Sequence, residues 1–307
     1  MSRLLKFLLV LVAIVALLAG LLFALFLLAN RTNGSLISAG EKRRYLLHVP
    51  ASYDPSQAVP LVISQHGFAE WPDNLRRISR WNDLADAEGF LVVYPAGTRF
   101  PLRWRSHATS GGQDDLQHDV TFINDLIDEL SATYAIDPQR IYVNGLSNGG
   151  GFSFTLSCKL ADSIAAFGSV AGAYLLPWEE CSPARQVPAI IFHGTEDEIV
   201  PFAGGISGPP AIPLPDITQW VDELAQRNGC DPDPQRMYPI VGEVIGLRYR
   251  YCAADVEFYV IHNGGHSWPG GEPLPEFIVG HTTRDIDATR EMWRFFTQHA
   301  LNDKGES

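Results

Sequence analysis

Positive charge is scarce in this sequence. Lys and Arg together number 23 against 35 Asp and Glu, which gives a formal net charge of −12. The longest run of basic residues is Lys42-Arg43-Arg44. A protein that binds nucleic acid or an anionic surface needs a basic excess to neutralise phosphates. The composition therefore argues against a nucleic-acid partner.

Cysteine is scarce as well, and the four residues present form no C-x-x-C pair: Cys158, Cys181, Cys230 and Cys252. No histidine pattern accompanies them, so the sequence does not predict a zinc site. An even number of cysteines fits two disulfides and an oxidising compartment. Four buried thiols in a cytosolic enzyme are the alternative interpretation.

Charge is absent from residues 7–29, an apolar run that follows Arg3 and Lys6. A helix of this length would cross the roughly 30 Å hydrocarbon core of a bilayer. A cleavable signal peptide has a shorter apolar region, about 7–15 residues, and residues 27–30 match a cleavage site poorly. We predict that residues 1–29 are a signal anchor, with a cleaved signal peptide as the alternative. Residues 30–40 are then a stalk, and residues 41–303 a single globular domain.

The side of the membrane is not settled by charge, because basic residues lie on both flanks of the apolar run. The even cysteine count favours an extracytoplasmic domain. The expected location is therefore a membrane-anchored extracytoplasmic domain, or a secreted one if the segment is cleaved.

The remaining chain has no internal repeat and no second globular unit. Strand-like apolar runs alternate with amphipathic helical segments. Strands are expected at residues 44–49, 60–65, 90–94, 141–144, 166–170, 189–193 and 256–262, and helices at 74–88, 119–134, 148–160, 217–227 and 284–299. This alternation predicts an α/β fold with a mostly parallel central sheet and helices on both faces. The Gly- and Pro-rich segment 203–215 is expected to be a loop over the sheet edge, either a lid element or a surface excursion.

The most informative segment is Gly145-Leu146-Ser147-Asn148-Gly149, which lies between a predicted strand and a predicted helix. A G-x-S-x-G sequence in this context predicts a nucleophile elbow, with the serine hydroxyl exposed on a tight turn. Ser147 is the expected nucleophile, and the Asn148 N–H is an expected oxyanion donor. A helix-capping serine in a glycine turn is the alternative.

A serine nucleophile needs an imidazole base that is oriented by a carboxylate. Asp197 follows the predicted strand 189–193, and we expect it to be the acid rather than Glu196 or Glu198. His266 follows the predicted strand 256–262 beyond a Gly-Gly turn, and we expect it to be the base rather than His262.

The second oxyanion donor is expected after the predicted strand 60–65, where His66 and Gly67 precede Phe68. Gly67 allows a close backbone approach, so the Phe68 N–H is the expected donor and His66 a scaffold residue. An ordinary turn is the alternative. Trp104 and Trp268 are candidates for flanking the substrate, with core packing as the alternative for each.

Motifs along most of the domain resemble one esterase family, which includes polyhydroxybutyrate depolymerases, feruloyl esterases and acetyl xylan esterases. The matching segments are residues 43–50, 66–67, 89–95, 145–150, 193–197 with 200–201, and 265–270. The resemblance implies an α/β-hydrolase fold, the nucleophile Ser147, the acid Asp197 and the base His266, without a metal or organic cofactor. It also implies the disulfides Cys230–Cys252 and Cys158–Cys181.

Two departures from the family affect the expected substrate. Phe68 stands where many members have cysteine, and the Thr-rich linker and polymer-binding domain of secreted depolymerases are missing. We therefore expect hydrolysis of a small or soluble ester, with a short-chain hydroxyacyl, acetyl or feruloyl group. An acyltransferase or peptidase on the same scaffold, or a non-catalytic binding module, is the alternative.

Overall fold

The computed structural model describes residues 3–29, 31–105, 113–208, 211–237 and 242–301. Residues 1, 2 and 30 of the predicted anchor and stalk lie outside the described residues. Residues 302 and 303, at the predicted end of the domain, also lie outside them.

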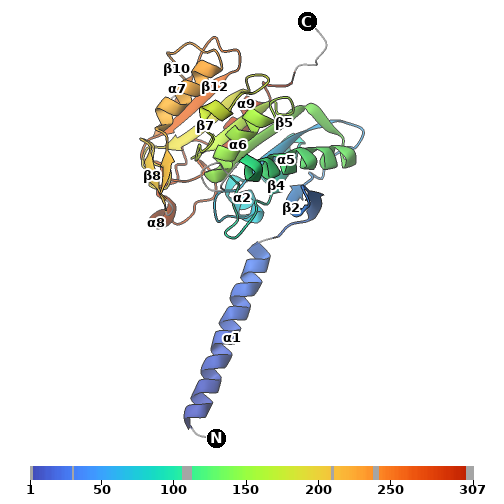
Figure 1. The fold of residues 1–307 in the computed structure, drawn as a ribbon, viewed down its shortest axis with the longest axis vertical. Helices are drawn as coiled ribbons and strands as arrows, with labels where there is room; N and C mark the ends of the chain where they lie inside the picture. The colour runs from blue at the N-terminus through green and yellow to red at the C-terminus, as the bar shows by residue number, and fades with distance from the viewer. Residues whose placement is uncertain (1–2, 30, 106–112, 209–210, 238–241, 302–307) are drawn as a thin grey trace.

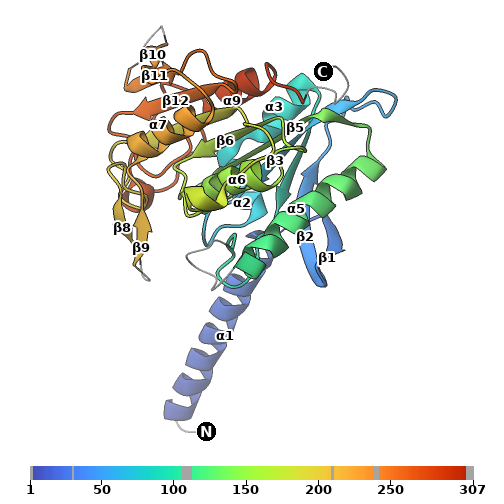
Figure 2. The ribbon, with the colours of Figure 1, turned by 45° about the horizontal axis from the view of Figure 1, so that its top comes forward.

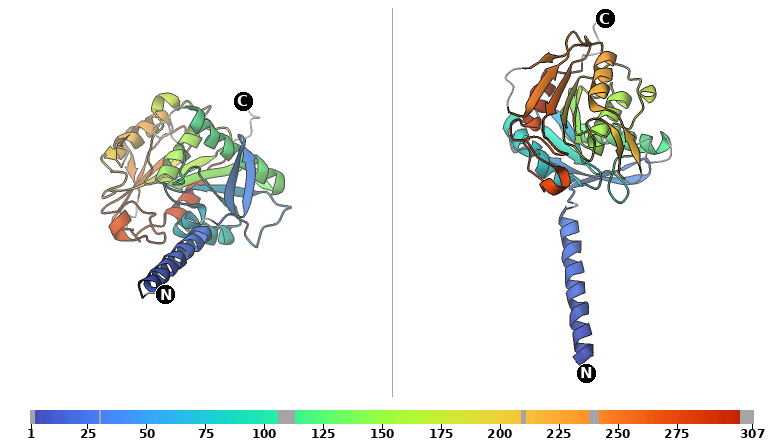
Figure 3. Two further views of the ribbon diagram at one scale, coloured as in Figure 1. Left: turned by 60° about the horizontal axis from the view of Figure 1, so that its bottom comes forward. Right: turned by 90° about the vertical axis from the view of Figure 1, so that its left-hand side faces the viewer.

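Helix α1 (Arg3–Ala29) extends away from the rest of the chain in Figures 1 and 3. Side chains are described for Leu5 and for residues 7–21 of this helix, and all of these residues are exposed. In the part of the chain that is described, no helix is both long enough and apolar enough to cross a membrane. The signal anchor predicted for residues 1–29 stays a prediction.

The predicted stalk is partly a strand of the domain. β1 (Gly34–Ser38) pairs antiparallel with β2 (Glu41–His48), with Ser38 opposite Glu41. Leu36 packs against the hydrophobic core from this strand. The globular domain thus begins near Gly34 rather than at residue 41, because the polar segment ends in a tight hairpin that returns to the sheet.

One ten-stranded sheet organises the domain, in the order β1-β2-β4-β3-β5-β6-β7-β12-β11-β10. Its six central strands are parallel: β4 (Leu91–Pro95), β3 (Val59–Gln65), β5 (Ile136–Leu146), β6 (Ala166–Val170), β7 (Ala189–Gly194) and β12 (Val256–Ile261). The antiparallel edge strands β10 (Gln235–Arg236) and β11 (Val244–Arg248) were not predicted. Both are short, and edge strands lack the long apolar runs of strands covered on both faces.

Helices cover both faces of the sheet, as Figure 2 shows. Successive side chains of a strand point to opposite faces, so Leu61 and Ile63 belong to one buried cluster and Val62 to the other. The first cluster includes residues of α5 (Gln113–Thr133), α6 (Asn148–Lys159) and α7 (Ile217–Arg227). The second includes residues of α2 (Pro72–Ser79), α3 (Trp81–Glu88) and α9 (Ala288–Phe296). This two-sided arrangement confirms the predicted α/β fold.

Three predicted segments differ in detail. The helix predicted at 74–88 is two helices, because Arg80 adopts a left-handed conformation (φ 58°) between them. Helix α9 begins later than predicted, where the Asp287 side chain caps it by accepting a hydrogen bond from the Arg290 N–H (3.1 Å). The predicted loop at 203–215 contains the hairpin of β8 (Gly205–Ser207) and β9 (Ile212–Leu214).

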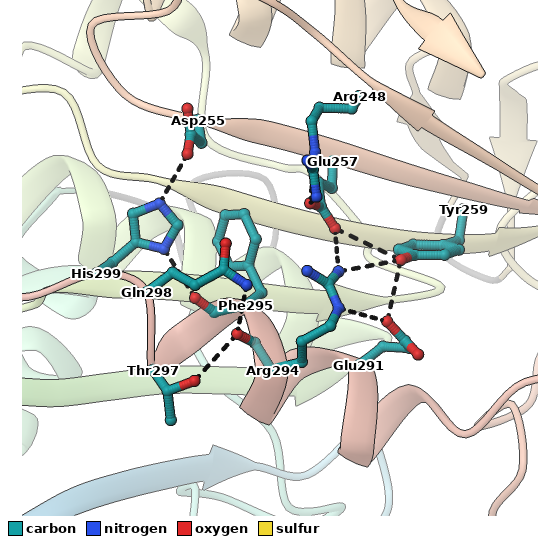
Figure 4. Close-up of polar contacts among 10 residues, drawn as sticks. All are labelled: Arg248, Asp255, Glu257, Tyr259, Glu291, Arg294, Phe295, Thr297, Gln298 and His299. Atoms are coloured by element: carbon teal, nitrogen blue, oxygen red, sulfur yellow. Dashed lines mark hydrogen bonds and ion pairs between the residues drawn. The ribbon is translucent and has the colours of Figure 1, made fainter. Parts of the chain in front are cut away.

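A charged network fixes α9 to the sheet (Figure 4). The Glu257 side chain on β12 is 2% exposed and forms ion pairs with Arg248 of β11 and Arg294 of α9. Arg294 Nε also donates to Glu291 (2.8 Å). A buried carboxylate requires such partners, because isolated charges are costly to remove from water. Glu257 lies near the start of β12, so the network stabilises the end of the sheet opposite the carboxyl ends of the parallel strands.

Both predicted disulfides are present. Cys158 of α6 is bonded to Cys181, which follows the 3₁₀ helix Trp178–Glu180. Cys230 is bonded to Cys252, and no cysteine is free. The bonds close loops with sequence separations of 23 and 22 residues.

Removing the Cys230–Cys252 bond is expected to lower the free energy of unfolding. A Cys230→Ser/Cys252→Ser variant should lose about 3 kcal/mol, the loop-closure contribution for a loop of this length. Urea unfolding followed by circular dichroism measures the change. A loss below about 0.5 kcal/mol would show that the bond does not constrain the unfolded chain as expected.

Candidate active site

Four predicted site residues follow carboxyl ends of parallel strands. Phe68 follows β3, Ser147 follows β5, Asp197 follows β7 and His266 follows β12. The carboxyl ends of parallel strands meet at one edge of a sheet, where α/β proteins bind their ligands. The topology therefore brings these residues to the same end of the domain, although 198 positions separate Phe68 from His266 in the sequence (266 − 68).

Ser147 lies in a strained turn between β5 and α6. Its backbone angles are φ 59° and ψ −120°, a region that residues with a side chain rarely occupy. Its N–H donates to the Val170 carbonyl (2.9 Å), which fixes the turn against β6. A Cβ atom added at Gly149 would lie 2.2 Å from the Gln65 carbonyl oxygen, so only glycine fits there. These features are those of the predicted elbow.

Asp197 and His266 are joined by a hydrogen bond of 2.8 Å between Oδ2 and Nδ1. An ionised carboxylate only accepts hydrogen bonds, so Nδ1 carries the proton. In the neutral ring, Nε2 then carries no proton and can act as an acceptor. Asp197 Oδ1 accepts from the N–H groups of Ile199 (2.9 Å) and Val200 (2.8 Å). Both carboxylate oxygens are therefore held in place.

The charge state of Asp197 follows from these contacts. Burial alone would raise the pKa of Asp197, but the hydrogen bond and charge of His266, with His193 and the Val200 N–H, outweigh it and hold the pKa below its usual value. The competing residues Glu196, Glu198 and His262 are exposed. Among these alternatives, the structure pairs only Asp197 with His266.

His193 supports the loop that carries Asp197. Its Nε2 donates to the Val200 carbonyl (2.9 Å) and lies 3.4 Å from Asp197 Oδ2. Burial lowers the pKa of His193, which favours the neutral ring even beside a carboxylate. This agrees with a structural role.

The backbone after β3 leaves one N–H group free. The Gly67 N–H donates to Glu70 Oε2 (2.8 Å), and the Ala69 N–H donates to the Leu102 carbonyl (2.8 Å). Between them, the Phe68 N–H has no hydrogen-bond partner among the described residues. The Asn148 N–H, at the first position of α6, also has none within the described ranges. Two unpaired donors beside a candidate nucleophile are what an oxyanion hole requires.

His66 stabilises this turn through hydrogen bonds of both ring nitrogens. Its Nδ1 donates to the Gly67 carbonyl (2.7 Å), and its Nε2 accepts from the Gly97 N–H (2.9 Å). Burial lowers the pKa of His66 to about 4, so the ring is neutral and has one donor and one acceptor, as the two bonds require. The scaffold role predicted for His66 fits this arrangement.

Two contributions to the site were not predicted. The Asn148 side chain accepts from the Trp104 N–H (2.7 Å) and donates to the Trp104 carbonyl (3.3 Å), which ties the segment before residue 106 to the elbow. Glu70 accepts from the Gly67 N–H and from Asn74 Nδ2 (2.6 Å). Burial raises the pKa of Glu70, although both hydrogen bonds and the charges of His266 and Arg77 oppose the shift. Neither role has a sequence signature, because the Glu70 contacts follow no recurring motif and the Asn148 contacts join segments distant in sequence.

A cavity of about 390 Å³ opens at Ser147. Most of its lining is apolar, and the lining includes Phe68, Trp104 and both strands of the β8–β9 hairpin. Trp104 is fully buried and stacks on Phe152 with ring centroids 4.7 Å apart, so it forms part of the cavity wall. No group of three or more His, Cys, Asp or Glu side chains that could hold a metal ion is found in the described ranges.

The predicted substrate contact of Trp268 is wrong. Its side chain is 1% exposed, and its Nε1 donates to Thr289 Oγ1 (2.9 Å). Trp268 does not belong to the lining of the cavity at Ser147. It packs in the second hydrophobic cluster, which also contains Ala288 and Met292 of α9.

Known proteins resemble this chain in sequence and in fold. The family described as "Esterase PHB depolymerase" matches residues 44–184. "Putative esterase NocK" of Nocardia uniformis subsp. tsuyamanensis is 30% identical over 277 residues, which cover 84% of this chain and 80% of that protein. Feruloyl esterase B of Piromyces equi is 30% identical over 249 residues, which cover 77% of this chain and 45% of the enzyme.

A solved structure supports the fold independently. Acetyl xylan esterase from Aspergillus awamori superposes with a TM-score of 0.60 at 13% identity, covering 86% of this chain and 98% of the enzyme. At this identity the similarity concerns the fold alone. Together with the sequence relatives, it shows that the chain is a carboxylic ester hydrolase of the α/β-hydrolase fold and belongs to the esterase family of polyhydroxybutyrate depolymerases, feruloyl esterases and acetyl xylan esterases.

Proposed function

We propose that the protein hydrolyses short-chain hydroxyacyl, acetyl or feruloyl esters through a Ser147–His266–Asp197 triad and an acyl-enzyme. The observation that carries the proposal is the buried His266–Asp197 hydrogen bond at the sheet edge where the strained Ser147 turn lies. Relatives named feruloyl esterase and acetylxylan esterase support the choice of ester.

The mechanism assigns one role to each residue. Ser147 Oγ attacks the ester carbonyl while His266 Nε2 takes its proton. Asp197 stabilises the imidazolium that forms, and the N–H groups of Phe68 and Asn148 donate to the oxyanion. His266 then protonates the leaving alcohol, and a water molecule, activated in the same way, releases the acid.

The substrate is tested with a panel of esters. We expect hydrolysis of p-nitrophenyl esters with short acyl chains, with activity falling toward palmitate, because the cavity at Ser147 has a volume of about 390 Å³. Methyl ferulate and a soluble hydroxybutyrate oligomer separate the feruloyl from the hydroxyacyl class. Inactivity of the folded protein on every ester would contradict the proposal. Product formation that requires an added alcohol or amine acceptor would favour an acyltransferase.

We also propose that residues 1–29 direct export and that the domain acts outside the cytoplasm. The two disulfides support an oxidising compartment, and α1 is an apolar helix separate from the core. Fractionation of producing cells, with mass spectrometry of the mature N-terminus, tests this and reports whether the segment is cleaved. The proposal would be contradicted if all of the activity were found in the cytoplasmic fraction, with the four cysteines of the active protein present as free thiols.

Glu70 is expected to position the turn that carries the Phe68 N–H. Glu70→Ala removes the acceptor of the Gly67 N–H, so kcat should fall about tenfold with KM little changed, since small displacements of an oxyanion donor weaken it. Steady-state kinetics on p-nitrophenyl butyrate measures both constants. Glu70→Gln, which retains an acceptor oxygen, should recover part of the loss. Asp73→Ala, which breaks only a partly exposed ion pair with Arg76, is the control. A larger loss in Asp73→Ala than in Glu70→Ala would contradict this role.

A further inference from the structure

Arg103 is the only charged residue in the described lining of the cavity at Ser147. The rest of that lining is apolar or uncharged, and no Asp or Glu is part of it. We propose that Arg103 binds a carboxylate on the substrate, so that the cavity selects esters with an apolar body and an anionic end. This inference rests on the proposed function and narrows its substrate class.

The guanidinium of Arg103 is available for a ligand. No hydrogen bond or ion pair joins its side chain to another group in the described part of the chain. Two other arginines near this loop are paired: Arg43 Nη2 lies 2.9 Å from Asp119 Oδ1, and Arg105 Nη2 lies 3.1 Å from Glu41 Oε1. A half-buried cation without a partner, in a protein with a net charge of −12, is a recognition group for an anion.

The backbone around Arg103 is fixed relative to Ser147. The N–H and C=O groups of Arg103 form reciprocal hydrogen bonds with Thr98 (3.1 and 3.0 Å). The preceding Leu102 carbonyl accepts from the Ala69 N–H, next to the candidate oxyanion donor. The following Trp104 is tied to Asn148, the residue after Ser147. Such a preformed position lowers the cost of ordering the charged side chain when it binds an anion.

The apolar part of the cavity restricts the remainder of the ligand. Leu175, Ile199, Val200, Ile212 and Leu214 line it, on segments other than the one that carries Arg103. A free anion without an apolar body would leave these walls in contact with water. The combination selects a monoanionic ester over a neutral ester of the same length and over a free acid such as acetate.

Matched pairs of esters test the inference. For the acyl side, mono-p-nitrophenyl glutarate is compared with p-nitrophenyl valerate. For the alcohol side, 4-acetoxybenzoate is compared with its methyl ester. We expect the charged member of one pair to have a kcat/KM at least about tenfold higher, the effect of one charge-assisted hydrogen bond. The pair that shows the preference identifies which side of the ester occupies the cavity.

Variants of Arg103 link the preference to this side chain. Arg103→Gln should reduce the ratio of charged to neutral kcat/KM to about one, and high salt should lower it in the wild type. Arg103→Lys, which keeps the charge, should retain part of the preference. Arg290→Gln removes an exposed arginine of α9 that is paired only with Asp287 in the described structure, and should leave the ratio unchanged.

The outcomes separate this inference from the proposed function. Hydrolysis of the neutral esters without preference for either charged partner would overturn the inference and leave the proposed function standing. A preference that survives in Arg103→Gln, in protein with wild-type circular dichroism, would also overturn it. Inactivity on all four esters would contradict the proposed function itself.

Discussion

Replacing Ser147 with alanine is expected to lower kcat on p-nitrophenyl butyrate by about 10⁴- to 10⁶-fold, the range found when a serine nucleophile is removed. The variant loses the only atom that forms the acyl-enzyme, so the general base and the oxyanion donors have no covalent step to assist. Stopped and steady-state assays of purified protein measure the loss, with a blank for spontaneous hydrolysis.

The fold should survive this substitution. Ser147 Oγ forms no hydrogen bond that is needed to hold the turn in the described structure, and alanine is smaller than serine. The left-handed backbone at position 147 is equally strained for both residues. Ser153→Ala on the same helix is a matched control, because Ser153 is buried and bonded to Gln65 and the Gly149 carbonyl but does not line the cavity. Activity in Ser147→Ala within tenfold of the wild type would contradict the role of the nucleophile.

Asp197→Asn is the second substitution with a large expected effect. We expect kcat to fall about 10³- to 10⁴-fold with the fold retained, because the amide can donate where the carboxylate only accepts, which disfavours the His266 tautomer with a proton on Nδ1. The loss of negative charge also removes the stabilisation of the imidazolium. Steady-state kinetics between pH 6 and 9 measures the effect.

Neighbouring carboxylates provide the control for Asp197. Glu196 and Glu198 are exposed residues of the same loop, and neither is bonded to His266 in the described structure. Glu196→Gln and Glu198→Gln should each change kcat less than about twofold, since exposed charges are screened by water and salt. A loss of kcat in either variant comparable to that in Asp197→Asn would show that the acid is not Asp197.

The central sheet could be predicted because its strands are covered on both faces. The apolar runs at 90–94, 166–170 and 189–193 correspond to β4, β6 and β7 within one residue at each end. Strands near the sheet edges, such as β1 and β11, escaped prediction because each spans only five residues and contains glycine, so neither forms a long apolar run. Their pairing depends on partners distant in sequence, which a single segment does not reveal.

The candidate site was predictable where chemistry restricts the residue type. Gly149 has to be glycine because the Gln65 carbonyl lies where its Cβ would be, and this leaves a recognisable motif around Ser147. Asp197 and His266 could be chosen because each follows a predicted strand, in the chain order nucleophile, acid, base. Glu70 and Arg103 could not be predicted in this way. The Glu70 contact with the Gly67 N–H is local but follows no recurring motif, and the place of Arg103 in the cavity depends on loops that meet only in the folded chain. A lone Glu or Arg is usually a solvated surface charge.

Trp268 illustrates the opposite error. Substrate contact was predicted for Trp268 with core packing as the alternative, and the structure supports the alternative, because the indole is buried with an N–H···Oγ bond to Thr289. Large aromatic side chains supply much of a core, and their polar atoms find partners inside it. Proximity in sequence to a site residue therefore carries little information about the direction of a side chain.

The most direct measurement is covalent labelling with a fluorophosphonate, followed by peptide mass spectrometry to locate the adduct. Such a reagent reacts rapidly only with a serine activated by its base and facing an oxyanion hole. We expect one adduct per chain, on Ser147, with labelling strongly slowed in Asp197→Asn and absent in Ser147→Ala. Folded wild-type protein that remains unlabelled, or an adduct on another serine, would contradict the account.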